Sequence, residues 1–441
     1  MSDSSASNDY QAIIDKDQSL LWHPYSSALE PSPVYPVGYA KGAKITLKDG
    51  RELIDGMSSW WSVIHGYNHP ELNEAAKSQI DDFAHVMFGG FTHEPAVKLA
   101  EKLINFSPEG LTKVFLCDSG SVSVEVAMKM SLQYWRSQGK PQKHRLLSLR
   151  KGYHGDTFAA MSVCDPETGM HHIFANVLNK QIFSDSPTVG FDEAFTEDHI
   201  RDFKQQIETH AHELSAVILE PIVQGTGGMN FYSPQFLQAV RTLCDQHDVL
   251  LIADEIATGF ARTGKMFACE HADVTPDILC LGKSLTGGYM TLAATLCTDK
   301  VAFGICSGEV PVFMHGPTFM ANPLACAVAL KNCEILERGE WKQQIQHINS
   351  IMKQELTPFE TIDGVRDVRT LGAIGVVELE APVTLHEVQD WFVSEGIWVR
   401  PFGRLVYIMP PFVISPEDLS VLCQKLGKVV EKICAHQATA P

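Results

Sequence analysis

The feature that most constrains the fold of this 441-residue chain is a repeated order of segments: a short apolar run, then turn-forming or acidic residues, then a stretch with helical periodicity. Buried strands that alternate with helices predict a largely parallel sheet with helices on both faces. In such α/β folds the chemistry lies just beyond the carboxyl ends of the strands. The runs are 114–116, 146–149, 216–219, 249–253 and 278–281, followed in turn by Asp118-Ser119-Gly120, Gly152, Glu220-Pro221, Asp254-Glu255 and Gly282-Lys283.

The segment 120–138 predicts the helix that follows the first run. Its apolar residues recur every four positions, and its basic residues fall late, where the helix dipole favours them. These residues are Val122, Val126, Met130 and Tyr134, with Lys129 and Arg136. A helix beginning at Ser121 points free N–H groups back toward Ser119-Gly120.

Composition narrows the function class. Hydrophobic residues make up 45% of the chain and the formal net charge is −18, so we expect a globular protein that does not bind nucleic acid. The start is polar and acidic, and no apolar run reaches the length of a membrane span, which predicts a cytoplasmic protein without membrane contact. The 11 cysteines are scattered without CxxC spacing, so we expect buried thiols and no metal site.

The chain also divides by pattern into two kinds of region. Residues 61–331 carry the strand and helix alternation and are expected to form a large domain. Residues 332–441 predict a smaller α+β domain, with a polar helix to about Glu355, strands at 374–379, 397–400 and 406–409, and a closing helix after Pro416. Residues 1–60, with the segment 37–53, are expected to add strands to that smaller domain.

Lys283 is the first candidate for chemistry. It lies in Leu281-Gly282-Lys283-Ser284 directly after a predicted strand. A P-loop is excluded because Asp277 stands where that motif requires its first glycine. A lysine at the end of a buried strand is costly to bury charged, so it is salt-bridged, reaches solvent, or is used as a covalent nucleophile.

Asp254 strengthens the chemical interpretation of Lys283. It also follows an apolar strand, in the segment Asp254-Glu255-Ile256-Ala257-Thr258-Gly259. A carboxylate at this place can keep a pyridinium nitrogen protonated, which makes pyridoxal phosphate an electron sink. A simple capping aspartate is the alternative.

Three further segments fit the same cofactor. Ser119-Gly120-Ser121 at a helix start can bind a phosphate, although an ordinary serine cap is the alternative. In Gly152-Tyr153-His154-Gly155-Asp156 an aromatic ring between two glycines can stack on a flat cofactor, or the segment can be a surface turn. His315-Gly316-Pro317-Thr318 offers a hydroxyl in a constrained turn.

Taken together, the segments 254–264 and 276–288 and the turns Ser119-Gly120 and Tyr153-His154-Gly155 resemble the class III, fold-type I, pyridoxal-phosphate-dependent aminotransferases. They occur in the family's order, and further stretches extend the resemblance over nearly the whole chain. The resemblance implies a large domain with a mostly parallel seven-stranded sheet and a smaller α+β domain from the N- and C-terminal segments. One departure is Ala261, where the family usually has glycine before Arg262.

The resemblance also implies roles for individual residues. Lys283 would hold pyridoxal 5'-phosphate covalently and then act as general base and acid, Asp254 would face the ring nitrogen and Tyr153 would stack on the ring. Gly120 and Ser121 would hold the phosphate. Pro317 and Thr318, beside Gly316 at the substrate site, would reach the phosphate from the other subunit of a homodimer. Arg400 would bind a substrate carboxylate, and Tyr25, Trp60, Trp61, Asp156 and Arg262 would surround the small-molecule substrates.

The sequence leaves several functions open. A dimeric transaminase with a ping-pong mechanism is the leading hypothesis. The sequence does not identify its amino donor, because the donor depends on the three-dimensional shape of the pocket. An ω-amino-acid or diamine transaminase that uses pyruvate or lysine is the alternative on the same fold. A cofactor-binding protein without turnover is a third hypothesis, and intact Lys283, Asp254 and Arg400 argue against it.

Overall fold

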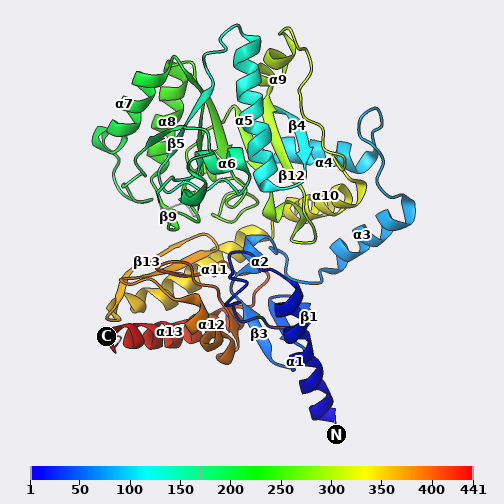
Figure 1. The fold of residues 1–441 in the computed structure, drawn as a ribbon, viewed down its shortest axis with the longest axis vertical. Helices are drawn as coiled ribbons and strands as arrows, with labels where there is room; N and C mark the ends of the chain where they lie inside the picture. Colours follow the sequence, from blue (N-terminus) through cyan, green and yellow to red (C-terminus); the bar gives the residue numbers. More distant parts are fainter. Residues whose placement is uncertain (1, 168–170, 440–441) are drawn as a thin grey trace. The chain divides into compact units, whose positions relative to one another are not determined.

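The computed structural model describes residues 2–167 and 171–439, which form two compact units (Figure 1). The first, here called the terminal unit, comprises Met1–Pro70 and Trp341–Pro441. The second, the central unit, comprises Glu71–Glu340. Each unit has its own sheets and its own buried apolar residues, so each is described by itself.

The central unit is built on a seven-stranded sheet in the order β4-β12-β11-β10-β7-β5-β6. All neighbouring pairs from β11 to β6 are parallel, whereas β12 is antiparallel to both β11 and β4. The mostly parallel sheet expected from the sequence is therefore confirmed. Its strands are β4 Leu111–Cys117, β5 Arg145–Leu149, β6 Ile182–Ser184, β7 Leu214–Leu219, β10 Leu250–Asp254, β11 Ile278–Leu281 and β12 Ala293–Thr298.

Helices cover both faces of this sheet. Helix α5, Gly120–Ser137, packs on β11, β12 and β7, and its neighbours are α6 and α9. Helix α8 packs on β10 and contacts α7. The bounds of the other helices are α3 Pro70–Asp82, α4 Glu94–Phe106, α6 Phe158–Val163, α7 Arg201–His210, α8 Pro234–Gln246, α9 Asp299–Cys306 and α10 Pro323–Glu337, with the short hairpin β8 Val223–Gln224 and β9 Asn230–Phe231.

The core of the central unit explains why the strands read as continuous apolar runs. Ile252 of β10, Ile218 of β7 and Ile278 of β11 form one buried cluster with the apolar face of α5. Strand residues alternate between the two faces of a sheet, and the intervening Leu251 and Val217 are equally buried. Both faces are therefore dry, as a parallel sheet between helices requires.

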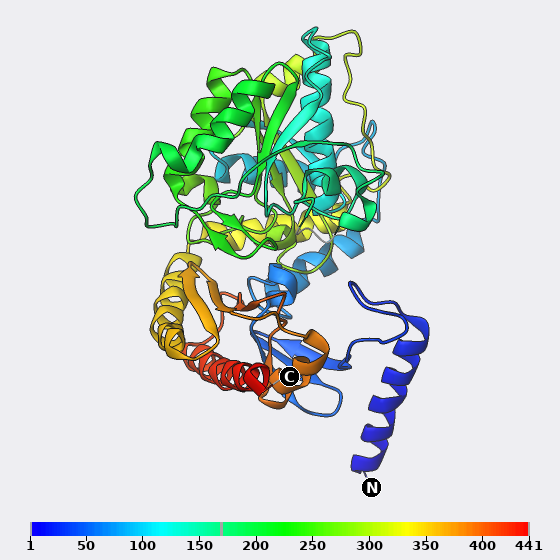
Figure 2. The same cartoon turned by 60° about the vertical axis from the view of Figure 1, so that its left-hand side comes forward.

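The terminal unit contains two small sheets. One has the order β1-β2-β3-β15, in which β15 from the C-terminal segment pairs parallel with β3 from the N-terminal segment. The other is the antiparallel sheet β13-β14-β16, against which α11 packs, and α11 lies beside α13 (Figure 2). The strands are β1 Val37–Lys41, β2 Lys44–Leu47, β3 Glu52–Asp55, β13 Val365–Leu371, β14 Ile374–Leu379, β15 Ile397–Trp398 and β16 Leu405–Ile408; the helices are α1 Ser2–Leu20, α2 Ser58–Trp61, α11 Trp341–Leu356, α12 Leu385–Ser394 and α13 Pro416–Thr439.

Two expectations about secondary structure need correction. The helix expected from Asn332 to Glu355 is wrong in extent, because α10 ends at Glu337 and α11 starts at Trp341. Gly339 between them has φ +80°, a left-handed conformation that ends a helix readily at glycine. Strand β12 was not expected at all, and it is the strand that runs against the direction of its neighbours.

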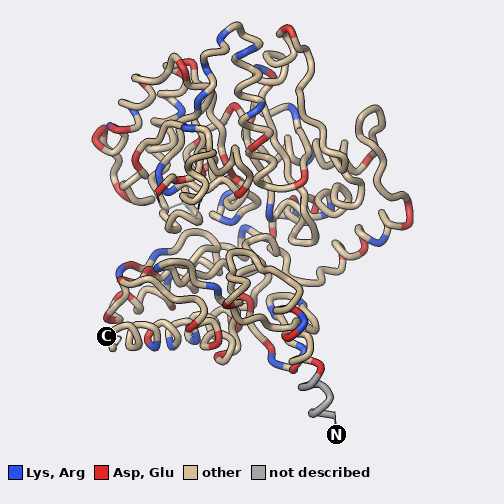
Figure 3. Tube along the Cα trace, viewed as in Figure 1, with Lys and Arg blue, Asp and Glu red and all other residues tan. Residues whose placement is uncertain are grey.

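Charge is spread along the chain in both units (Figure 3). Lysine and arginine are interspersed with aspartate and glutamate along the trace. In the part of the chain that the structure describes, no helix has both the length and the apolar composition needed to cross a bilayer. Ten of the cysteines are buried free thiols, and Cys306 is exposed.

Replacing Ile252 by alanine tests the packing of the central sheet. Ile252 is fully buried between α5 and two neighbouring strands, so Ile252→Ala should destabilise the protein by about 2–5 kcal/mol and lower its unfolding temperature by several degrees. Val421→Ala on α13, at a side chain that is 37% exposed, is the control and should leave the temperature nearly unchanged. Equal shifts in calorimetry for the two variants would contradict this core.

Candidate active site

Lys283 lies where β11 ends, at the start of a short 3-10 helical turn, Lys283–Thr286. Its backbone is left-handed, with φ +38°, which is uncommon outside glycine and indicates a constrained position. Burial lowers the pKa of Lys283 to about 8, against the opposing effect of the negative charges of Asp254, Glu220 and Asp156. Roughly a tenth of this amine is therefore neutral, and hence nucleophilic, at pH 7, far more than for a lysine with a pKa of about 10.4.

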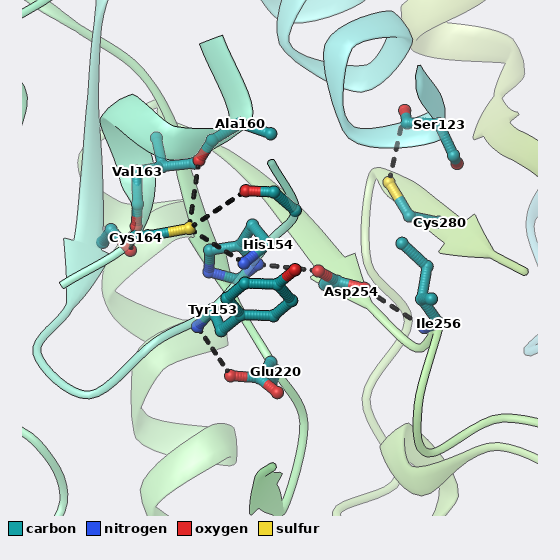
Figure 4. A network of polar contacts seen from close by, with 12 residues as sticks. Ser123, Tyr153, His154, Ala160, Val163, Cys164, Glu220, Asp254, Ile256 and Cys280 are labelled. Atoms are coloured by element: carbon teal, nitrogen blue, oxygen red, sulfur yellow. Dashed lines mark hydrogen bonds and ion pairs between the residues drawn. The ribbon is translucent and has the colours of Figure 1, made fainter. Parts of the chain in front are cut away.

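Asp254 ends the neighbouring strand β10, and two hydrogen bonds fix its carboxylate (Figure 4). Its Oδ2 lies 2.7 Å from Nδ1 of His154, and its Oδ1 accepts the N–H of Ile256 at 3.1 Å. The backbone N–H of His154 donates in turn to Sγ of Cys164 at 3.1 Å. Because an ionised carboxylate only accepts hydrogen bonds, Nδ1 carries the proton in this pair, and the imidazole holds Asp254 in one orientation.

Glu220, just beyond the end of β7, is a second buried carboxyl group. Its Oε1 accepts the N–H of Tyr153 and its Oε2 accepts the N–H of Gly225, each at 3.0 Å. Burial raises the pKa of Glu220 to about 7, and the neighbouring His154 opposes that shift. Glu220 thus ties the turn that carries Tyr153 to the turn that carries Gly225, and adds negative charge near Lys283.

The Tyr153 side chain is held by Asp156 and His171. The phenol donates to Oδ1 of Asp156 at 3.0 Å, and Nε2 of His171 lies 2.9 Å from the same oxygen. The rings of Tyr153 and His171 stack with centroids 6.0 Å apart and an interplanar angle of 29°. An aromatic ring fixed in this way can lie against a flat ligand.

The start of helix α5 adds backbone N–H groups to the same place. Ser119 precedes the helix in extended conformation, and its side chain makes no capping bond, so the helix start keeps donors for another acceptor. The hydroxyl of Ser121 accepts the N–H of Asp156 at 3.1 Å. A Cβ on Gly155, whose φ is +122°, would lie 2.2 Å from that hydroxyl oxygen, and a Cβ on Gly120 would lie 3.0 Å from the side chain of Ile256. Glycine is therefore what lets these loops approach.

These groups of the central unit fit pyridoxal phosphate. The structure brings together a partly neutral lysine, a carboxylate held by an imidazole, a fixed aromatic ring and a helix start. They would face the aldehyde, the ring nitrogen, the ring face and the phosphate of that cofactor, respectively. They come from the ends of four different strands, as expected for a site at the carboxyl edge of a parallel sheet.

The predicted phosphate residues Pro317 and Thr318, with Gly316, lie on a segment between α9 and α10. The carbonyl of Thr318 lies 2.7 Å from Nε2 of His85. The preceding His315 lies 3.1 Å from Nζ of Lys129, on the side of α5. Thr318 is exposed, and its assignment to the site of a second subunit stays a prediction.

The terminal unit holds the predicted carboxylate-binding residue Arg400 and three of the predicted wall residues, Tyr25, Trp60 and Trp61. The guanidinium of Arg400 lies over the ring of Trp60, 5.9 Å from its centroid, and Trp60 meets Tyr25 edge-on at 6.5 Å. Burial lowers the pKa of Arg400, and Tyr407 opposes that shift. Trp60 and Arg400 also line a cavity of about 470 Å³ with mostly apolar neighbours. A fixed guanidinium beside apolar walls suits a carboxylate at the end of an aliphatic chain.

The two tryptophans stand on an unusual backbone. All four residues of α2, Ser58, Ser59, Trp60 and Trp61, have positive φ, between 46° and 77°. A left-handed conformation costs about 1–2 kcal/mol for each residue with a side chain. Trp61 is buried, and its ring centroid lies 6.2 Å from that of Tyr407. The strained turn therefore places one indole in the interior and the neighbouring one, Trp60, at the surface.

Arg262 is fully buried in the loop that follows Asp254. Ala261 before it has φ +76°, and Phe260 has φ +59°. The family's usual glycine at position 261 would take this conformation without strain, whereas alanine retains it at an energetic cost. The structure therefore shows that the alanine is accommodated without abandoning the left-handed conformation.

Sequence reasoning gave no role to His154 or Glu220. His154 was noted only as part of the Tyr153 turn, and Glu220 only as a residue that follows a strand. Their roles depend on contacts with Asp254 and Gly225 that the sequence alone does not reveal. The weak signal available was position, since both follow apolar strands at the edge where the other site residues gather.

Comparison with known proteins gives consistent relatives. Residues 25–430 match the family model for aminotransferase class-III. The chain is similar to the protein named adenosylmethionine-8-amino-7-oxononanoate aminotransferase from Buchnera aphidicola subsp. Acyrthosiphon pisum. The two are 52% identical over 94% of this chain and 97% of the relative. The protein of the same name from Corynebacterium glutamicum is 49% identical over 95% of this chain and 99% of the relative.

Solved structures agree with these sequence relatives. The enzyme of that name from Methanocaldococcus jannaschii superposes with a TM-score of 0.90 at 33% identity, over 96% of this chain and 99% of that one. A PLP-bound amine transaminase from an uncultivated Pseudomonas species superposes with a TM-score of 0.87 at 31% identity, over 94% of this chain and 99% of that one.

The reactivity of Lys283 tests the electrostatics of the site. After removal of any bound carbonyl compound with hydroxylamine, labelling of Lys283 by acetic anhydride should rise with pH with a midpoint near 8, because burial disfavours the ammonium form. Free lysine added as an internal standard has a pKa of about 10.4 and should be labelled with a midpoint there. Mass spectrometry of the peptide gives both curves, and a Lys283 midpoint near that of the standard would contradict the site.

Replacement of Ala261 by glycine tests the strain in the Arg262 loop. Ala261→Gly should stabilise the protein by about 1 kcal/mol, because glycine adopts a positive φ without a steric penalty. Both backbone bonds of the residue, to Met266 and Gly264, are retained. The same substitution inside helix α9, Ala302→Gly, should destabilise by about 1 kcal/mol. Unfolding temperatures that move in the same direction for both variants would refute the strain.

Proposed function

The chain belongs to the class III aminotransferase family, and we propose that it transfers an amino group from S-adenosyl-L-methionine to 8-amino-7-oxononanoate in biotin biosynthesis. The product would be 7,8-diaminononanoate. The observation that carries the proposal is identity of about 50% over nearly the whole chain to relatives whose names state these two substrates. Because it is an enzyme of the aminotransferase class, its substrates are small molecules.

The family implies pyridoxal 5'-phosphate as cofactor, and one similar structure is described as PLP-bound. When bound, this cofactor supplies an electron sink that stabilises negative charge on the carbon bearing the amino group. We assign Lys283 as its covalent anchor, Asp254 as the partner of the ring nitrogen and Tyr153 as the stacking residue. Gly120 and Ser121 hold the phosphate in this assignment.

Lys283 also moves protons in the proposed reaction. Its Nζ accepts the proton from Cα of the amino donor in the first half-reaction and delivers a proton to C7 of the oxononanoate in the second. A pKa of about 8 allows the amine to do both near neutral pH. Asp254 is oriented by its contact with His154 and does not move protons in this proposal.

Further residues are assigned to substrate recognition. Arg400 binds a substrate carboxylate with its planar guanidinium, and the rings of Trp60 and Tyr25 enclose the aliphatic chain. The buried Trp61 supports this wall from behind. Asp156, exposed beside Tyr153, favours a cationic donor such as the sulfonium of adenosylmethionine. Arg262, with its buried side chain, shapes the loop behind Asp254.

We further propose a cytoplasmic homodimer in which Gly316, Pro317 and Thr318 serve the site of the second subunit. Several large apolar side chains of the central unit are exposed, as expected for a surface that a second copy covers. These side chains include Met87, Phe91, Met314 and Phe319. The large catalytic domain would span 61–331, and the segments 1–60 and 332–441 would form the smaller domain.

A class III transaminase with another donor is the second candidate. Similar solved structures include amine and omega transaminases, at 26% to 31% identity. Such an enzyme would keep every assignment around Lys283 and differ in the residues around Trp60 and Arg400. Alanine or lysine would then be its donor, and adenosylmethionine would not react.

The absorbance spectrum of the purified protein tests the donor. Adenosylmethionine added alone, without air, should abolish the visible band of the bound cofactor, and 8-amino-7-oxononanoate should restore it. Alanine and lysine, added to separate samples, should leave the band unchanged. Loss of the band with alanine or lysine alone would refute the proposed donor and favour the second candidate.

Substitution of Lys283 tests the catalytic assignment in the same assay. Lys283→Ala removes both the anchor and the proton carrier, so turnover should fall by about a thousandfold or more. Lys204→Ala, at an exposed lysine of α7, is the matched control and should keep full activity. Retention of activity by Lys283→Ala would overturn the assignment.

A further inference from the structure

The turn α2, Ser58–Trp61, is a left-handed helical turn made without glycine. Ser59 has φ 47° and ψ 61°, and Trp60 has φ 54° and ψ 49°, close to the left-handed helix. The N–H of Trp61 donates to the carbonyl of Met57 at 3.0 Å, and that of Ser62 to Ser58 at 2.9 Å. Since residues with side chains rarely adopt this conformation in succession, the surrounding structure must stabilise it.

The carboxylate of Asp55 is the main support of this turn. Asp55 is fully buried at the end of β3. Its Oδ1 accepts the N–H of Met57 at 2.7 Å and that of Ser58 at 3.2 Å, which are the groups that lead into the turn. A buried carboxylate that accepts several donors has one favourable orientation, so it fixes the entry of the chain into α2.

Tyr67 and Met409 fasten the turn at two further points. The hydroxyl of Tyr67 donates to Oδ2 of Asp55 at 2.7 Å and lies 2.7 Å from Oγ of Ser59. Burial raises the pKa of Tyr67, with the Asp55 charge acting in the same direction, so the phenol stays protonated as a donor. The hydroxyl of Ser58 donates to the carbonyl of Met409 at 2.7 Å.

The turn determines where two indole rings stand. Trp60 is 43% exposed and faces Arg400 and Tyr25, whereas Trp61 is 6% exposed and faces Tyr407. If the turn relaxed to right-handed backbone, the directions of both side chains from their Cα atoms would change. The contact between Trp60 and the guanidinium of Arg400 therefore depends on the left-handed conformation.

We propose that Asp55 is a positioning residue for substrate recognition, which holds Trp60 against Arg400 through the left-handed turn. This proposal rests on the proposed function only in naming 8-amino-7-oxononanoate as the ligand of Arg400. Asp55 acts through the backbone of α2 and does not take part in proton transfer. Its loss should weaken substrate binding and leave the chemistry at Lys283 intact.

Kinetics of Asp55 variants test the substrate part of the proposal. Asp55→Ala should raise KM for 8-amino-7-oxononanoate about tenfold or more and change kcat less than about threefold. Asp55→Asn should give a smaller rise in KM, because its amide oxygen can still accept the N–H groups of Met57 and Ser58. Ile433→Val, a conservative change at a buried residue of α13 in the same unit, should leave KM unchanged.

Fluorine NMR tests the structural part without any substrate. The chain has seven tryptophans, so 5-fluorotryptophan labelling gives seven signals, and Trp60→Phe and Trp61→Phe identify the two from α2. In the full-length protein with its cofactor, Asp55→Ala should move or broaden these two signals. Trp398, the strand partner of Asp55, should also shift, and the other four signals should stay in place. Ile433→Val should leave both in place, and Asp55→Asn should shift them less than Asp55→Ala.

The outcomes separate the two proposals. Unchanged Trp60 and Trp61 signals in Asp55→Ala would overturn the positioning role, whatever the enzyme's substrate. Shifted signals with an unchanged KM would overturn the link to substrate binding, as would a fall in kcat with KM unchanged. If the unaltered protein turned over neither adenosylmethionine nor 8-amino-7-oxononanoate, the proposed function would fall, and the fluorine signals would still decide the role of Asp55.

Discussion

The central unit is organised around the amine of Lys283, which is buried from water and lies close to three carboxyl groups. Lys283 follows the buried strand β11, and the carboxyl groups of Asp254, Glu220 and Asp156 lie near enough to influence its charge. Burial favours the neutral amine and the carboxylates favour the ammonium, and the balance leaves a pKa of about 8. A lysine in free solution would be almost entirely protonated at neutral pH, so the fold itself supplies the nucleophile.

Two of these carboxyl groups differ because their surroundings differ. Asp254 is paired with an imidazole and a single backbone N–H, which suits its proposed role as the partner of the ring nitrogen. Glu220 accepts two backbone N–H groups in a fully buried place, and burial raises its pKa to about 7. Glu220 thus acts mainly on the backbone, where it joins the Tyr153 turn to the Gly225 turn. In the proposed assignment, Asp254 is the carboxyl group that faces the cofactor.

Much of the central fold could be predicted from the sequence, because its strands are apolar over their whole length. The runs before Asp254 and Lys283 became β10 and β11, with the polar residues at their carboxyl ends. The break between α10 and α11 at Gly339 was missed because the helical pattern continues across it. The pairing of His154 with Asp254 joins positions 100 residues apart, and no local pattern reports such a contact.

The left-handed turn at Ser58–Trp61 could not have been predicted on any local ground. Its sequence lacks the glycine that such backbone normally requires, and Ser-Ser-Trp-Trp has no preference for it. Its cause is tertiary, since Asp55, Tyr67 and Met409 hold it from outside. The same reasoning applies to Ala261, whose strain the chain tolerates beside a fully buried arginine.

The most direct test of the central claim is to identify the lysine that carries the cofactor. Borohydride reduction of the purified protein with its cofactor bound fixes the cofactor on that lysine, and mass spectrometry of the digested chain then locates it. The account predicts one modified lysine, Lys283, and no modification of the peptide in Lys283→Ala. A cofactor fixed on another lysine of the unaltered protein, or on none, would contradict it.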